Sequence, residues 1–433
     1  MSLTELHTHL YGCLQPDDLR WLYHRKVPRP HIYINSYREY YGHDPEFHEL
    51  FHDDSDARAK LERSYYFDHP DNFQAFQIRF NLIISVAHAD PEELPAVCDR
   101  VLAHEPAGYV EYRMLYPPRD RVEYQEMVLA TCEGLRTAER THTGKQARVA
   151  VSLFRDDRVC RQSYEWLREV LEAHTVARQY VCAIDFCAQE EGYPPAEKKD
   201  FVQEVLRSNR DNPGGALAVL YHVGESYTDK SVESAARWIV EAARMGAHRL
   251  GHCVAMGVRP ELYAGQTGRE IVRERRDQIA FELEHCDELR QAGIAVDADL
   301  LQREAKLLAE KSPGDTVTYV YDPQRVDRLR QFQDWCMRAV GATGAIIESC
   351  PTSNLLIANL RSPDNHPLHR FLEADLPVVI GADDPGILNT NLEREFQQIE
   401  SWEGISEEKI AAMQSLAEKS KSDLLTGKTN APG

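Results

Sequence analysis

The chain has 433 residues, of which 42% are hydrophobic and 28% charged, and this globular composition excludes a disordered or fibrous protein. Its net charge of −20, from 70 acidic and 50 basic residues, disfavours nucleic-acid or anionic-membrane partners. No apolar run could cross a bilayer, and the N-terminus lacks the regions of a signal peptide. Ten scattered cysteines without a C-x-x-C pair predict free thiols. These features predict a cytoplasmic protein.

Eight short apolar runs have the composition of buried strands, each closed by polar or glycine residues. Helical periodicity fills most of the stretches between them, as in 91–104, 163–174, 231–245 and 323–340. This alternation favours an α/β fold, a (β/α)8 TIM barrel, over an open doubly wound sheet. The predicted strands span residues 3–9, 109–116, 148–154, 180–188, 217–224, 249–253, 345–350 and 377–382.

Two segments exceed the usual length of a connection, and we predict both to be insertions in a single barrel domain over residues 1–420. The first, about 25–73, is rich in Tyr, His, Pro and Asp, and the second, about 254–343, contains charged helical stretches at 269–290 and 297–311. Long insertions on a barrel usually cover the C-terminal mouth. For the second, a contact between copies in a homo-oligomer is an equal alternative. The polar tail, 421–433, is predicted to fray.

Residues of the kinds that bind metals fall at the ends of four predicted strands. A strand places His7 and His9 on the same face, because its side chains alternate. In a barrel all strand ends meet at one mouth, where three imidazoles and a carboxylate could surround zinc. The remaining residues of this pattern are His222 with Glu225 three positions on, His252, and the adjacent Asp383 and Asp384.

The sequence resembles the adenosine deaminase family, within the metal-dependent amidohydrolase barrels, over most of its length. The resemblance is carried by motifs in order along the chain. They are Glu-Leu-His-Thr-His-Leu-Tyr-Gly (5–12), Tyr-Val-Glu-Tyr-Arg (109–113), Ile-Asp-Phe-Cys-Ala-Gln-Glu (184–190), His-Val-Gly-Glu (222–225), Arg-Leu-Gly-His (249–252), Cys-Pro-Thr-Ser-Asn (350–354) and Ala-Asp-Asp-Pro (382–385).

The resemblance implies a zinc-dependent hydrolytic deaminase of an adenine-type nucleoside, nucleotide or base. It implies one divalent metal, Zn²⁺ in the first place, and it assigns the proton donor to Glu225 and the positioning of the attacking water to His252. Asp384 would hydrogen-bond the purine N7. The implied metal ligands are His7, His9, His222 and Asp383.

The chemistry of the reaction explains these residue types. Hydroxide must add to C6 of the purine, and a bound zinc lowers the pKa of water to about 7. The ring accepts this attack when N1 is protonated, which a carboxyl group kept neutral in a dry site can do. A second carboxylic acid that faces N7 would fix the ring in register.

Three departures from the family pattern bear on the rest of the substrate. Tyr11 stands where the family usually has a short carboxylate or amide that reaches the ribose, and Ala188 stands where a glycine amide usually faces the purine N3. The 254–343 insertion is unusually long. Tyr11 removes a negative charge, and Arg25, Lys26, Arg29 and the arginines of the insertion are candidate phosphate partners. We therefore expect a 5′-modified adenosine, a nucleotide or a 6-substituted adenine compound to be preferred. The alternative is that Tyr11 stacks over ribose and adenosine remains the best substrate.

Other catalytic patterns are weaker. Residues 48–52 form a formal H-E-x-x-H, but Pro45 precedes it and Asp53 follows it, so we predict a short helix over the barrel mouth rather than a protease site. The H-x-E and P-C-x-x-C motifs of the other zinc deaminases do not occur. The fourth strand, 180–190, lacks the lysine that a two-metal site would need. The remaining alternatives are a metal hydrolase of the same barrel with another substrate and a barrel that binds without turnover.

Overall fold

The computed structural model describes residues 2–428 and contains an eight-stranded parallel sheet. Neighbouring strands follow the chain in the order β1-β2-β3-β4-β5-β6-β9-β10. All eight predicted strands are confirmed, each with ends within a few residues of the prediction. They are β1 (Thr4–His9), β2 (Tyr109–Leu115), β3 (Gln146–Ser152), β4 (Val181–Asp185), β5 (Ala218–Val223), β6 (Arg249–His252), β9 (Ile346–Ser349) and β10 (Val378–Ile380).

Hydrogen bonds at the end of β10 bring the sheet back to its first strand. The backbone N–H of Asp383 donates to the carbonyl of His7 at 2.8 Å, and the N–H of His9 donates to the carbonyl of Asp383 at 2.9 Å. This parallel bridge between Thr8 and Asp383 closes the barrel, so the predicted (β/α)8 fold is confirmed. It also places the last predicted metal ligand beside the first two.

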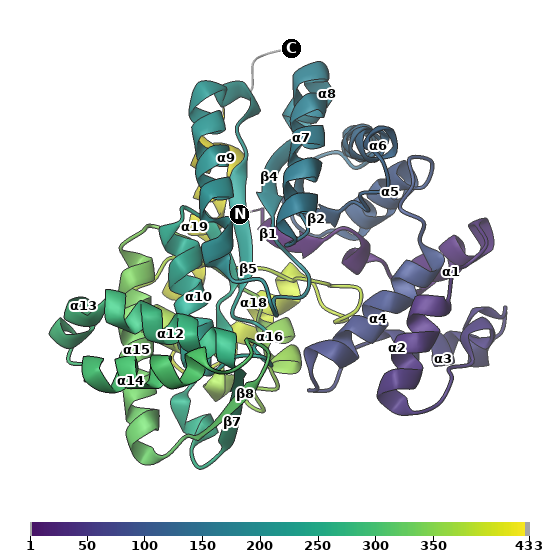
Figure 1. The fold of residues 1–433 in the computed structure, drawn as a ribbon. Helices are drawn as coiled ribbons and strands as arrows, with labels where there is room; N and C mark the ends of the chain where they lie inside the picture. Colours follow the sequence, from purple (N-terminus) through teal and green to yellow (C-terminus); the bar gives the residue numbers. More distant parts are fainter. Residues whose placement is uncertain (1, 429–433) are drawn as a thin grey trace.

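Helices form the outer layer of the barrel (Figure 1). Several begin at side chains that accept a hydrogen bond from the first helical turn, among them Asp120, Asp156 and Ser231. The helices that follow the strands are α5 (Leu94–His104), α6 (Arg121–Thr141), α7 (Asp157–Ala173), α8 (Thr175–Tyr180), α9 (Lys199–Asp211), α10 (Val232–Arg244), α15 (Pro323–Gly341), α16 (Pro351–Ile357), α17 (Leu368–Glu373), α18 (Leu392–Glu400) and α19 (Glu407–Lys419). Residues 2–428 include no helix that is long and apolar enough to cross a membrane.

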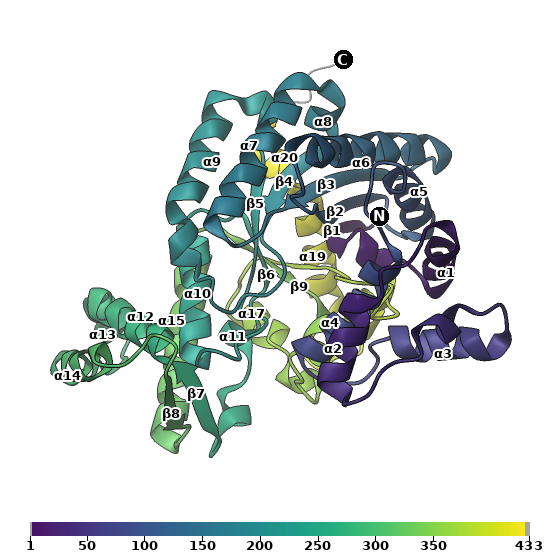
Figure 2. The same ribbon diagram turned by 45° about the vertical axis from the view of Figure 1, so that its right-hand side comes forward.

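The first insertion lies beside the mouth, where Figure 2 shows its helices grouped on one side of the barrel. It contains α2 (His31–Tyr41), α3 (Ser55–Tyr65) and the start of α4 (Phe73–Val86), and it follows α1 (Pro16–Arg25). Residues of α2 and α4 line the cavity at the mouth, as expected for this insertion. The predicted short helix is a 3₁₀ helix, Phe47–Phe51, but it is not part of the cavity lining.

Residues 260–320 of the predicted second insertion form a separate lobe that packs on the outside of α10, whereas α15, which falls within the predicted bounds, belongs to the outer layer of the barrel. The insertion begins with α11 (Val254–Gly257) and holds α12 (Val272–Glu284), α13 (Cys286–Gln291) and α14 (Ala298–Ala309). The charged stretch predicted to be helical from residue 269 starts instead as strand β7 (Thr267–Ile271), because this segment pairs antiparallel with β8 (Thr316–Val320). None of the residues that line the cavity comes from 254–343, so the expected cover over the mouth is not formed by this insertion.

The tail packs under the barrel instead of fraying. Residues 422–426 form α20 (Ser422–Thr426), and both the N–H and the hydroxyl of Ser422 donate to the buried carboxylate of Glu111, at 2.7 and 2.6 Å. Lys428 donates to the carbonyl of Val181 at 2.6 Å. The prediction of a frayed tail missed these contacts because both acceptors lie far away in the sequence. Residues 429–433 of that predicted tail lie outside the described residues.

We expect Ser422→Ala to lower the free energy of unfolding by about 1–3 kcal/mol, because a buried carboxylate oxygen loses a hydrogen-bond donor. Urea denaturation at constant pH measures this change. The control is Thr141→Ala, whose exposed hydroxyl bonds only to its own helix and should cost less than about 0.5 kcal/mol. Equal effects of the two substitutions would contradict an anchored tail.

Candidate metal centre and active site

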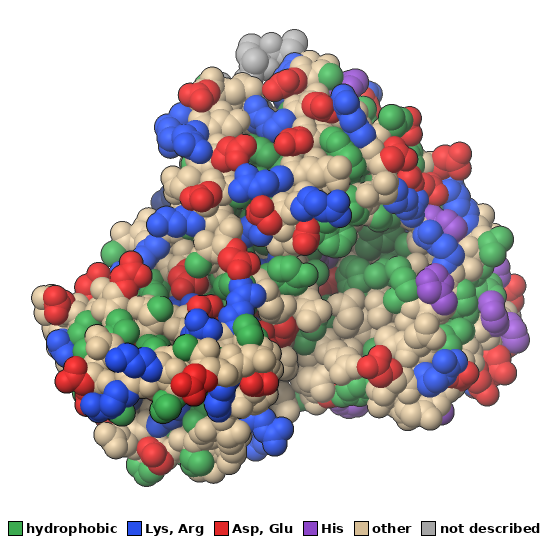
Figure 3. Space-filling model, in the orientation of Figure 1, with side chains coloured by type: hydrophobic (Ala, Val, Ile, Leu, Met, Phe, Trp, Pro, Cys, Tyr) green, Lys and Arg blue, Asp and Glu red, His purple; other side chains and the backbone are tan. Residues whose placement is uncertain are grey.

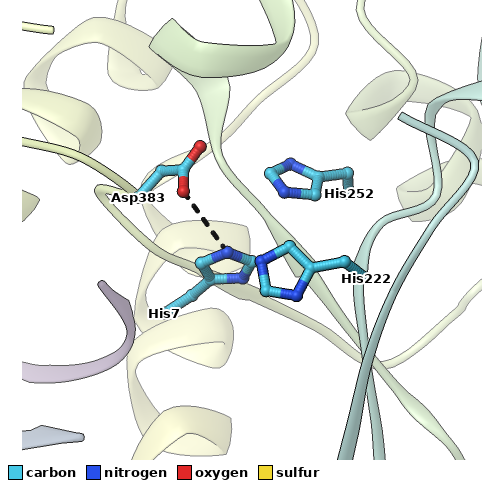
Figure 4. Close-up of side chains that lie close together, drawn as sticks. All are labelled: His7, His222, His252 and Asp383. Carbon is cyan, nitrogen blue, oxygen red and sulfur yellow. Dashed lines mark ion pairs between the residues drawn. The ribbon is translucent and has the colours of Figure 1, made fainter. Parts of the chain in front are cut away.

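The C-terminal ends of the strands bring the predicted site residues together. His7 and His9 come from β1, His222 from β5 and His252 from β6, and Asp383 follows β10. Figure 4 shows four of these side chains pointing toward one another, with Nε2 of His7 3.5 Å from Oδ1 of Asp383. His252 and Asp383 both have left-handed backbone, with φ of 65° and 62°. Such strained backbone at strand ends is typical of functional sites, where it turns side chains inward.

Four donor atoms are spaced as the ligands of one divalent cation. Nε2 of His9 lies 3.3 Å from Nε2 of His222 and 3.3 Å from Oδ1 of Asp383. Ligand distances of about 2.0–2.1 Å in a tetrahedron put donor atoms roughly 3.4 Å apart. The distances from His9 to His222 and to Asp383, and from His7 to Asp383, match this value. This His/Asp cluster could hold a divalent metal, because ligand atoms lie within 4.8 Å of one another in two groups of residues: His7, His222, His252 and Asp383, and His9, Asp383 and Asp384.

Buried carboxylates fix the orientation of two imidazoles. Nδ1 of His7 lies 3.0 Å from Glu348, and Nδ1 of His222 lies 3.0 Å from Asp185. Each pair directs Nε2 toward the other donors, as in metal sites generally, although Arg113 also contacts both Nε2 atoms. Burial lowers the pKa of His222 to about 3 despite the nearby charge of Asp185, so its ring is neutral and able to bind a metal.

Arg113 lies directly beside the donor set. Its Nη1 donates to Nε2 of His7 at 2.9 Å and to Nε2 of His222 at 3.0 Å, and its Nη2 pairs with Glu348. A cation bound by the same nitrogens would sit close to this guanidinium. Glu348 and Asp185, which lies 3.8 Å from Arg113, supply negative charge to balance both.

Two buried carboxyl groups, those of Glu225 and Asp384, stand next to the donor set. Their pKa values are shifted in the opposite direction from that of Asp383. Burial raises the pKa of Glu225 and of Asp384 well above their usual range, and the charge of Asp383 raises both further. Hydrogen bonds with His7 and His9 outweigh the effect of burial at Asp383 and hold its pKa low. Oδ1 of Asp384 is buried beside Gly12 without a hydrogen-bond partner among the described residues, and Asp384 is one of the residues that line the cavity. Both carboxyl groups are thus shifted toward the neutral form, in which each can donate a hydrogen bond.

The turn that carries Glu225 is held by a second glutamate. Glu190 accepts from the N–H of Gly224 at 2.8 Å and from the N–H of Glu225 at 2.9 Å. Gly224 has a φ of 73°, and a Cβ there would lie 2.6 Å from Ile239, so this position requires glycine. Ser353 donates to Oε1 of Glu225 at 3.4 Å.

His252 lies beside the predicted metal ligands, and two neighbours contact its Nδ1. The side-chain amide of Asn354 lies 2.9 Å from its Nδ1, and Oε1 of Glu225 lies 3.5 Å from the same nitrogen. Burial lowers the pKa of His252, so its ring is neutral. Its atoms also lie within 4.8 Å of those of His7, His222 and Asp383, which makes His252 a neighbour of the donor set.

A cavity of about 600 Å³ opens above this site, and the hollow is visible in Figure 3. Tyr11, Ala188 and Asp384, the three predicted substrate-binding residues, all line it. The hydroxyl of Tyr11 donates to Glu93 at 2.7 Å, so the ring rather than the hydroxyl faces the cavity. Gly12 makes room for Asp384, because a Cβ there would lie 1.7 Å from its Oδ1.

The rival H-E-x-x-H residues do not join the site. Nδ1 of His48 lies 2.9 Å from the hydroxyl of Tyr23, and Glu49 pairs with Lys60. The clusters of candidate ligands found among residues 2–428 contain neither His48 nor His52. Conversely, the residues that sequence reasoning did not single out are the supporting partners: Asp185, Glu190, Glu348 and Asn354. Three of these residues lie inside the motifs that carry the family resemblance. The only signal for Glu348 in the sequence is that it is a charged residue within an otherwise apolar predicted strand.

The fold and the donor set together define a (β/α)8 barrel with a buried site suited to a divalent cation. Among solved structures, an adenine deaminase from Arthrobacter aurescens covers 99% of this chain and 97% of its own, with a TM-score of 0.55 at 15% identity. Arabidopsis ADAL complexed with IMP covers 97% of this chain and 92% of its own, with a TM-score of 0.56 at 15% identity. At these identities the likeness establishes the fold.

Sequence comparisons agree with the structural ones. The adenosine deaminase family model matches residues 316–423. An adenosine deaminase of Shewanella denitrificans is 29% identical over 139 residues, and an adenine deaminase of Rhizobium leguminosarum is 28% identical over 160. These alignments cover 30% and 35% of this chain but only 39% and 48% of the relatives. The predicted resemblance to the adenosine deaminase family is confirmed by these matches.

We expect His222→Ala to abolish stoichiometric binding of a divalent metal, because it removes one of four ligands whose lone pairs converge. Elemental analysis of protein purified in the presence of zinc gives the metal content. His48→Ala and His52→Ala serve as controls and should keep the wild-type content. A full equivalent of metal in His222→Ala would disprove the assigned ligand set.

Proposed function

We propose that the protein is a hydrolytic deaminase of adenine-type substrates that releases ammonia. One observation supports this proposal above the others: two neutral buried acids, Glu225 and Asp384, border a set of metal-type donors at the floor of one cavity. A 6-aminopurine has acceptor nitrogens at N1 and N7, on either side of the reacting C6. Two acids that donate hydrogen bonds complement these two nitrogens.

We assign the metal to His7, His9, His222 and Asp383, and we propose Zn²⁺ because three imidazoles and one carboxylate suit this ion. When bound, zinc supplies Lewis acidity that lowers the pKa of water to about 7. The spacing of the donor atoms supports this assignment.

Glu225 is assigned as the acid that protonates N1 while water adds to C6. Desolvation and the neighbouring charge of Asp383 keep its proton in place until the ring accepts it. Glu190 and Ser353 limit the movement of this carboxyl group. His252, held neutral and oriented by Asn354, is assigned to position the attacking water.

Asp384 is assigned to donate to N7 and thereby fix the ring in register. Its unpartnered Oδ1 supports this role, since a buried polar atom without a partner is costly unless a ligand satisfies it. Ala188, whose φ is 64°, is assigned to present its N–H toward N3, and the ring of Tyr11 to border the sugar or its equivalent.

We place the enzyme in the cytoplasm, where its ten free cysteines, nine of them buried, would stay reduced. A homo-oligomer formed through the 254–343 lobe also stays a proposal. Leu300, Leu307 and Val320 are exposed apolar side chains of that lobe and support such a contact.

We expect Glu225→Gln to lower kcat for adenosine or its best analogue by at least about 10²-fold, because the amide keeps the size of the side chain but cannot transfer the proton. Ammonia release and metal content are measured on the same preparation, and metal content should be unchanged. The control is Glu191→Gln, next to the anchoring Glu190 but outside the cavity lining. An unchanged kcat in Glu225→Gln would remove this residue from the mechanism.

A further inference from the structure

The outer part of the cavity has a chemical character different from its floor. One face of α4 supplies much of its wall, with side chains spaced so that they line up along the helix. Apart from Gln77, these side chains are apolar: Phe73, Phe76, Phe80, Ile83 and Ile84. Ile84 is 37% exposed at the rim, and Ile32 of α2 is 42% exposed, so the apolar surface reaches the opening.

A second group of apolar side chains comes from the ends of β2 and β3. Met114 and Leu115 close β2, Pro117 and Pro118 follow it, and Phe154 follows β3. Ala87, Ala89 and Ile357 complete the apolar lining. Aliphatic and aromatic walls of this kind bind groups that gain by leaving water, and a ribose or phosphate hydrated on all sides does not.

The cations that the sequence offered to a phosphate are mostly placed elsewhere. Lys26 forms an ion pair with Asp90, and Arg25 donates to the carbonyl of Glu92, so neither lines the cavity. The arginines of the 254–343 lobe do not line it either. Their positions do not support a phosphate site on Arg25, Lys26 or the arginines of the lobe, whereas Arg29, the third early candidate, does line the cavity.

Three arginines do line the cavity, and each has a partner. Arg113 is buried at the floor against Glu348, and Arg119 pairs with Glu123. Arg29 is exposed and donates to the carbonyl of Ala87, and Arg119 donates to the carbonyl of His88, so both arginines adjoin the segment that follows α4. His31 and His88 also line the cavity, whereas the lining residues of α4 itself, 73–84, include no cationic side chain.

From these observations we infer that the substrate is an adenine-type compound that carries a bulky apolar substituent, alkyl or aryl, on the side of the molecule away from C6. The adenine ring occupies the polar floor, and the substituent occupies the space between α4 and the end of β2. A cavity of about 600 Å³ lies in the range typical of larger organic ligands, roughly 300–1,000 Å³. This inference rests on the proposed deaminase function and specifies its substrate class.

A series of substrates that differ only at the 5′ position tests the inference. The metal-loaded protein is assayed for ammonia release with AMP, adenosine, 5′-methylthioadenosine and 5′-phenylthio-5′-deoxyadenosine. We expect kcat/KM to rise along this series, with the phenylthio compound at least about tenfold above adenosine. The reason is that burying one additional apolar group in such a pocket raises kcat/KM about tenfold or more. A preference for AMP or for adenosine would overturn the inference.

Variants of the apolar wall test whether this wall causes the preference for the phenylthio compound. Ile84→Ser at the rim and Phe80→Ala on the same helix face should each raise KM for the phenylthio compound about tenfold and change kcat/KM for adenosine less than twofold. The control is Val122→Ser, because Val122 is 64% exposed and is not part of the lining. Melting temperatures show whether each variant remains folded. Equal losses with adenosine and with the phenylthio compound would contradict a role for this wall in recognising the substituent.

Binding of deaminated products separates this inference from the proposed function. Calorimetry compares inosine with 5′-phenylthio-5′-deoxyinosine, and neither needs turnover. If no adenine compound is deaminated but the phenylthio product binds at least about tenfold tighter, the proposed activity is wrong and the apolar subsite stands. If adenosine is deaminated and the two products bind equally, the activity stands and the apolar subsite is wrong.

Discussion

A chain of paired charges crosses the interior of the barrel, and the candidate metal centre depends on it. Glu348 accepts from His7 and pairs with Arg113 and, at 2.7 Å, with Arg249. Arg249 pairs in turn with Glu111, which accepts from Ser422 in the tail. These charged groups are fully buried, and removing one member of such a pair leaves an uncompensated charge that costs about 3–5 kcal/mol. The register of β1, β2, β6 and β9 and the docking of the tail are therefore linked to the orientation of one imidazole in the site.

Burial favours the neutral form of three carboxyl groups and two imidazoles of the site, and their neighbours decide which of them stays charged: Glu225, Asp383, Asp384, His222 and His252. Asp383 keeps its charge because His7 and His9 hydrogen-bond to it. That charge then makes ionisation harder for Glu225 and Asp384, which have no comparable cationic partner. Two functions follow from one set of carboxyl groups, since the ionised one can bind a metal and the neutral ones can donate hydrogen bonds to a ring.

The sequence predicts the site best where residues of the kinds that bind metals fall at the ends of predicted strands. That His7, His9, His222 and Asp383 meet was predictable because a barrel gathers all strand ends at one mouth. The structure places Nε2 of His9 3.3 Å from His222 and from Asp383, and Nε2 of His7 3.5 Å from Asp383. Contacts between distant segments were not predictable in this way. Nothing local indicates that Ser422 meets Glu111, that Asn354 meets His252, or that the lobe from 254 onward packs against α10 and leaves the mouth open. In these cases tertiary packing, and not local pattern, selects the partner.

The separation between a polar floor and an apolar wall also explains how one barrel can keep its chemistry while its substrate changes. The floor residues are fixed by strand ends and by buried partners such as Glu190 and Glu348, so a substitution there disturbs the closed hydrogen-bond network. The wall comes from α4 and from the residues after β2, which contact the floor through few polar groups. Apolar side chains can be exchanged with little effect on distant electrostatics, since they carry no charge and need no partner. Under the proposed function, selection for a new substituent would act on the wall, and the reaction at C6 would depend on the residues that cannot vary independently.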